Sequence, residues 1–182
     1  MIFPIEKILV ADDRIENIRA AETYFKTQKM LTEHASSAHE AIEKIEESYL
    51  EKPYDIVLTD LQMEDEYSGA LVAWIGYKHQ AYSLIVTGKD ILESNGHGNT
   101  TSILPLMKYV KGMKSDSAVW GEVWRNVMQH LDTQGVLYNS LKQVRNYVRT
   151  PLDSNAEICM LAFPEEYQTG ARLLLEKQIE RK

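Results

Sequence analysis

A chain of 182 residues with 44% apolar and 26% charged side chains is typical of a soluble globular protein, large enough for one well-buried core plus an extension. Its net charge of -7 argues against a nucleic-acid surface or an anionic membrane surface, because both need a basic face. The lone cysteine, Cys159, excludes a disulfide framework and a thiolate metal site. We expect a cytoplasmic protein, since no apolar stretch approaches membrane-spanning length and the first residues lack the pattern of a signal peptide.

Strands and helices alternate along the first third of the chain. Short apolar runs predict buried strands, and apolar residues at helical spacing predict amphipathic helices between them. The strongest strand signal is the Ile-Val-Leu run that ends at Asp60, because it has no polar alternation and follows Pro53. The predicted order is strand, helix, strand, helix, strand, over residues 7–11, 15–28, 31–35, 38–49 and 54–60.

The alternation continues beyond an acidic, turn-prone loop. A third helix is expected from Ala70, a fourth strand over 82–87 and a brief fifth strand over 107–110. A further helix is predicted from Ser117, with a broad apolar stripe that we interpret as core packing, although part of it could be a dimer face. Repeated strand-helix units imply parallel strands with right-handed crossovers.

The predicted fold class is therefore α/β, a doubly wound parallel sheet of about five strands with helices on both faces. We expect a domain over residues 1–131 and a C-terminal extension over 132–182, mostly helical, that packs on the domain or serves assembly. The extension carries no motif that indicates chemistry.

Polar side chains follow several of the predicted strands, at the edge of the sheet where ligands bind in parallel α/β folds. The residues expected to meet there are Asp12, Asp13, Asp60, Thr87 and Lys111. Three carboxylates in one pocket repel one another unless a cation compensates them, and Mg²⁺ suits such oxygen ligands. Alone, an Asp after a strand is more often a helix cap, so the prediction depends on the whole set.

A magnesium site of this kind suits phosphoryl transfer. Asp60 would be the nucleophile and form an aspartyl phosphate, with Asp13 on the metal directly and Asp12 mainly through water. Thr87 would hydrogen-bond one phosphoryl oxygen and Lys111 would pair with another. Lys111 is preferred to Lys108 because it follows the predicted strand instead of starting it.

These motifs resemble those of the response-regulator receiver domains of two-component signalling. The resemblance covers roughly residues 5 to 131 and rests on residues 8–14, 54–63, 84–88 and 109–112, in family order. It implies a flavodoxin-like sheet ordered 2-1-3-4-5, and phosphate taken from a histidine kinase or phosphotransfer protein. It also implies signalling to a downstream protein partner, without nucleic acid or membrane. The resemblance places the last metal ligand, a backbone carbonyl, on Gln62.

Two positions differ from the family, which usually has proline where this chain has Glu64 and Gly112. These differences keep open a pseudo-receiver, an interaction module with the same fold that does not cycle phosphate. A Mg²⁺-dependent phosphatase of the haloacid-dehalogenase type is a more distant alternative, because the Asp-x-Asp motif of that family is missing after the first strand. On the leading interpretation the protein is not an enzyme in the usual sense but a phosphoacceptor that assists its own phosphorylation and dephosphorylation.

Overall fold

The computed structural model describes residues 4–49, 51–65, 68–88, 107–109 and 113–133. Lys111 and nearly all of the predicted extension over 132–182 lie outside this set. The element order is β1 (Lys7–Ala11), α1 (Ile15–Thr27), β2 (Leu31–Ala35), α2 (Ala38–Ser48), β3 (Ile56–Thr59), α3 (Ser68–Lys78), β4 (Tyr82–Thr87), β5 (Met107–Tyr109) and α5 (Ser117–Thr133).

The sheet is parallel throughout and has the order β2-β1-β3-β4-β5. Four strands form its main part, and the three-residue β5 pairs with β4 at one edge. The predicted α/β class and the strand order are confirmed. The central strands β1, β3 and β4 are buried along their whole length, as their largely apolar sequences predict.

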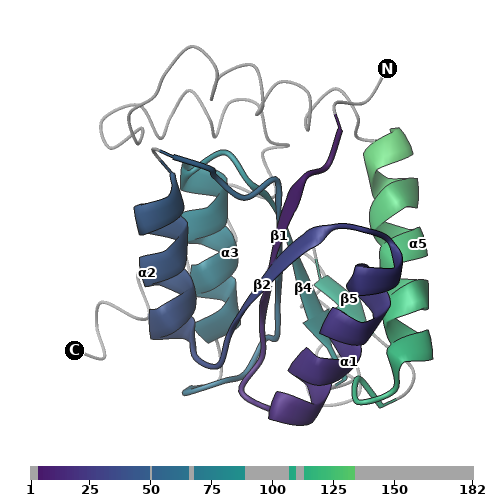
Figure 1. Ribbon diagram of the computed structural model, residues 1–182. Helices are drawn as coiled ribbons and strands as arrows, with labels where there is room; N and C mark the ends of the chain where they lie inside the picture. Colours follow the sequence, from purple (N-terminus) through teal and green to yellow (C-terminus); the bar gives the residue numbers. More distant parts are fainter. Residues whose placement is uncertain (1–3, 50, 66–67, 89–106, 110–112, 134–182) are drawn as a thin grey trace.

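Helices cover both faces of the sheet, with α1 and α5 packed together on one face and α2 and α3 on the other (Figure 1). The core is accordingly in two layers. The layer under α1 and α5 contains Phe25, Trp120 and Trp124, whose rings meet edge to face. The predicted core role of the two tryptophans is confirmed, since Trp120 is 1% and Trp124 is 8% exposed.

The start of α2 shows how local sequence sets an element boundary. Ser37 has an extended backbone and its Oγ accepts a hydrogen bond from the Glu40 backbone N–H at 3.1 Å, as in a capping box. The Glu40 carboxylate reaches back to the backbone N–H and hydroxyl of Ser36, one residue before the position expected in a capping box.

Helix α3 begins at Ser68, two residues earlier than predicted.

Within the described ranges, none of the helices combines the length and the hydropathy that crossing a bilayer would require.

Candidate active site

The strand register brings the predicted carboxylates to one level at the carboxyl edge of the sheet. Ala11 of β1 lies opposite Thr59 of β3, so that Asp12 and Asp60 leave neighbouring strands side by side. The Asp60 backbone N–H donates to the Ala11 carbonyl at 2.8 Å, which continues the pairing of the two strands by one residue. The two aspartates are therefore held by the sheet itself.

The three aspartates form one acidic cluster. Asp12, Asp13 and Asp60 each offer a carboxylate oxygen, and these oxygens lie within 4.8 Å of one another. Asp12 is buried, Asp13 is exposed and Asp60 is intermediate. The prediction that these residues meet is confirmed.

Asp12 is the most firmly fixed of the three. Its Oδ1 accepts hydrogen bonds from the Arg14 backbone N–H at 3.0 Å and from Asn17 Nδ2 at 2.9 Å. Arg14 is the N-cap residue of α1 and makes no side-chain cap of its own, so Asp12 supplies a hydrogen-bond acceptor at this helix start. Asp12 therefore belongs to the acidic cluster and holds the backbone just before α1, but it is not the N-cap of that helix.

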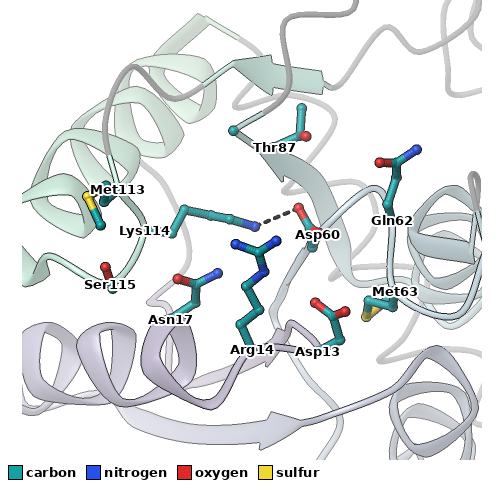
Figure 2. Close-up of a pocket in the computed structure, with 11 residues that line it drawn as sticks. Asp13, Arg14, Asn17, Asp60, Gln62, Met63, Thr87, Met113, Lys114 and Ser115 are labelled. Atoms are coloured by element: carbon teal, nitrogen blue, oxygen red, sulfur yellow. Dashed lines mark hydrogen bonds and ion pairs between the residues drawn. The ribbon is translucent and has the colours of Figure 1, made fainter.

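The ammonium group in the site belongs to Lys114. Lys114 Nζ donates to Asp12 Oδ2 at 2.6 Å, to Asp60 Oδ1 at 2.5 Å and to the Val86 carbonyl at 3.2 Å, and Figure 2 shows it reaching Asp60. Its side chain is 8% exposed. Sequence reasoning assigned this place to Lys111, which lies outside the described residues, and missed Lys114.

The position of Lys114 is related to the helix that follows it. Strand β5 ends at Tyr109 and α5 starts at Ser117, so Lys114 comes three residues before the helix. The Trp120 indole N–H of α5 donates to the Lys114 carbonyl at 2.7 Å and is buried. The lysine is thus positioned by the helix that follows it, whereas the prediction measured its position from the preceding strand.

A cavity of about 610 Å³ opens beside this cluster. Gln62 and Thr87, both predicted site residues, line it together with Asp13, Asp60 and Lys114, and Thr87 is buried at the end of β4. In Figure 2 Thr87 and Asp13 lie on opposite sides of Asp60. The remaining lining residues are Arg14, Asn17, Met63, Gly88, Met113 and Ser115.

The loop after Asp60 is packed against the start of α3. The Gly69 backbone N–H donates to the Leu61 carbonyl at 3.0 Å. A Cβ at Gly69 would overlap the Asp60 carbonyl oxygen and stand 2.9 Å from Leu61 Cα. Only glycine permits this approach, so Gly69 fixes where the backbone runs on from Asp60.

The electrostatics of Asp60 reflect its partial burial. Burial raises the pKa of the Asp60 carboxyl above its ordinary value, and the negative charge of Asp12 acts in the same direction. The Lys114 ammonium and a hydrogen bond from the Leu61 backbone oppose this rise in pKa without cancelling it. Ionised Asp60 is therefore stabilised by Lys114 but still less favourable than in water.

The donor set fits a hard divalent cation. Carboxylate oxygens of Asp13 and Asp60, close together and facing a polar cavity, are the ligands that Mg²⁺ takes, with waters completing its shell. Both Asp12 oxygens already accept hydrogen bonds, which suits a ligand that acts through water.

Solved structures with a similar fold are response-regulator receiver domains. One from Methanospirillum hungatei has 18% identity and a TM-score of 0.51, and the match covers 72% of this chain and 98% of that one. TrrA of Thermotoga maritima, solved in complex with Mg²⁺-BeF, has 21% identity and a TM-score of 0.50 over 69% of this chain and 98% of that one. The chemotaxis response regulator CheY4 of Vibrio cholerae has 16% identity and a TM-score of 0.50 over 68% and 99%. The chain has the receiver-domain fold.

The receiver fold is thus confirmed by comparison with solved structures and not by comparison of sequences. No protein-family model matches the chain, and no curated protein matches its sequence. The matched receiver domains are covered almost entirely, whereas about seven tenths of this chain takes part in the first match.

Proposed function

We propose that this chain is a two-component response regulator in which Asp60 accepts a phosphoryl group from a histidine kinase or phosphotransfer protein. The observation that carries the proposal is the Lys114 ammonium, which bridges Asp12 and Asp60 beside an exposed Asp13 at the carboxyl edge of the sheet. A nucleophilic carboxylate, an acidic metal cluster and a cation in one cleft are the parts that phosphoryl transfer requires.

Each residue has a specific task in the transfer. An ionised Asp60 oxygen attacks phosphorus while the phosphorus–nitrogen bond of the donor histidine breaks, and its electron pair returns to the imidazole. Lys114 would pair with a phosphoryl oxygen and the Thr87 hydroxyl would donate to another, since both residues line the cavity. Asp13, Asp60 and the Gln62 carbonyl would hold Mg²⁺ directly and Asp12 through water. The ion would neutralise charge on the phosphoryl oxygens.

The chain would be a phosphoacceptor that assists its own phosphorylation and dephosphorylation. Its output would be a contact with a downstream protein. The α5 stripe that suggested a dimer face is largely used in the core, since Trp120, Val123, Val127 and Leu131 are each 1% exposed or less. A homodimer therefore stays a prediction that the buried residues of this stripe do not support.

The competing proposal is a pseudo-receiver that keeps the fold but does not cycle phosphate. The missing prolines at Glu64 and Gly112 favoured it. The assembled cleft weighs against it, because Lys114 is buried and paired with the acceptor instead of lying in solvent.

Formation of a beryllofluoride adduct distinguishes the two. With Mg²⁺, beryllofluoride should bind the wild-type chain and give a bound fluorine signal by ¹⁹F NMR, and the signal should be lost in Asp60→Asn. A folded wild-type chain without that signal would exclude the phosphoacceptor and leave the pseudo-receiver.

A further inference from the structure

The loop that carries the acceptor and the Gln62 carbonyl is tied to a helix far away in the sequence. Glu64 Oε1 accepts hydrogen bonds from the backbone N–H groups of Ala38, at 2.7 Å, and His39, at 3.4 Å. These are the first two residues of α2. The Glu64 carboxylate therefore joins the acceptor loop to the start of α2.

The contact completes the start of that helix. The first four N–H groups of a helix have no partner within it. In α2 these groups run from the N-cap Ser37 to Glu40, because the Ala41 N–H already makes the first regular helical bond, to the Ser37 carbonyl. The Glu40 N–H donates to Ser37 Oγ, and the N–H groups of Ala38 and His39 donate to Glu64. A carboxylate is also favoured there by the positive end of the helix dipole.

The other end of the loop is held by α3. The Met63 backbone N–H donates to Ser68 Oγ at 3.1 Å, and the Gly69 N–H donates to the Leu61 carbonyl. The Met63 side chain packs on the core layer that contains Ala38. The loop from Leu61 to Glu64 is thus clamped between α3 on one side and α2 on the other.

We infer that Glu64 is a positioning residue for the metal site: its contact with α2 fixes the loop whose Gln62 carbonyl and Asp60 carboxylate would hold Mg²⁺. This inference rests on the proposed function. Proline, which receiver domains usually have at this position, restrains the chain through its own ring. Glu64 achieves the restraint through a long-range hydrogen bond to another element.

The test compares Glu64→Ala with the matched control Glu16→Ala, because Glu16 is an exposed acid in the first turn of another helix, α1. Mg²⁺ affinity is measured by isothermal titration calorimetry. Amide hydrogen exchange of residues 61–65 and 38–40 is measured separately in EDTA. Glu64→Ala should bind Mg²⁺ about tenfold or more weakly, as is typical when the support of a metal ligand is removed, and both segments should exchange faster. Glu16→Ala should match the wild type in both measurements.

Glu64→Gln keeps the length and an acceptor oxygen, so a smaller change in the same direction is expected, and it replaces the alanine variant if that variant does not fold. Equal Mg²⁺ affinity and equal exchange in the wild type and the Glu64 variants would overturn the inference. If the wild type binds no Mg²⁺, the proposed function fails, and exchange in EDTA alone then decides whether Glu64 positions the loop.

Discussion

At the scale of single residues, the site depends on which lysine reaches Asp60. Lys114 Nζ contacts two carboxylates and a carbonyl within 3.2 Å, and its carbonyl is held by a buried tryptophan.

Replacing Lys114 should damage both stability and chemistry. Lys114→Ala leaves Asp12 and Asp60 facing each other without a cation, which should cost on the order of 3 kcal/mol in the free energy of unfolding in metal-free buffer. Phosphorylation by acetyl phosphate should slow by about a hundredfold or more, because one preorganised charge contact with the phosphoryl group is lost. Urea unfolding and intact-mass kinetics measure the two effects. The control Lys111→Ala should change neither, and equal effects of the two variants would contradict the assignment.

The raised pKa of Asp60 gives a pH-dependent prediction. Because burial holds the pKa above its value in the unfolded chain, the ionised form is less favourable in the fold. This residue's contribution to metal-free stability is therefore greatest at low pH and falls as pH rises through the interval between the unfolded and folded pKa.

Asp60→Asn removes that dependence and keeps the size of the side chain. The difference in unfolding free energy between Asp60→Asn and the wild type should grow in favour of the variant as pH rises through this interval. Urea titrations in EDTA at several pH values measure it. A difference that shrinks with rising pH would show that Lys114 outweighs burial.

At the scale of elements, helices α3 and α5 position the chemistry more than the strands alone suggest. Gly69 at the start of α3 lies against the Asp60 backbone, and Trp120 of α5 holds the lysine backbone while its ring packs on Phe25. The site is therefore connected to both helical layers.

The Trp120 contact can be removed with little change of shape. Trp120→Phe keeps an aromatic ring in the core but loses the N–H donor, which leaves the buried Lys114 carbonyl without that partner. We expect a loss of about 1 to 3 kcal/mol in the free energy of unfolding and weaker retention of beryllofluoride. Trp124→Phe is the control, since it perturbs the same aromatic layer and should leave beryllofluoride binding unchanged. Equal retention in the two variants would mean that Trp120 serves packing alone.

Gly69→Ala should displace the acceptor loop. The added methyl overlaps the Asp60 carbonyl oxygen, so the backbone must shift, at a cost of about 3 kcal/mol by analogy with overpacked cores. Mg²⁺ should then raise the melting temperature less than in the wild type. Gly88→Ala is the control for stability, because a Cβ there meets nothing within 4 Å. A Gly69→Ala protein with wild-type stability and Mg²⁺ response would contradict the role of this close approach.

At the scale of the whole molecule, hydrophobic patterning predicted the architecture well. Buried parallel strands and amphipathic helices follow from local composition, and so does the meeting of Asp12, Asp13 and Asp60, because each directly follows a strand or stands one residue beyond it. Lys114 and Glu64 were not predictable in the same way. Their places depend on hydrogen bonds to Trp120 and to the start of α2, which link residues through the tertiary fold and leave no local pattern.

The most direct test of the central claim is phosphorylation of the intact chain by acetyl phosphate with Mg²⁺, followed by intact-mass spectrometry. The account predicts an increase by the mass of one phosphoryl group that requires Mg²⁺, disappears in Asp60→Asn and is lost again on dephosphorylation. A folded wild-type chain whose mass does not change, or an adduct of equal yield in Asp60→Asn, would contradict it.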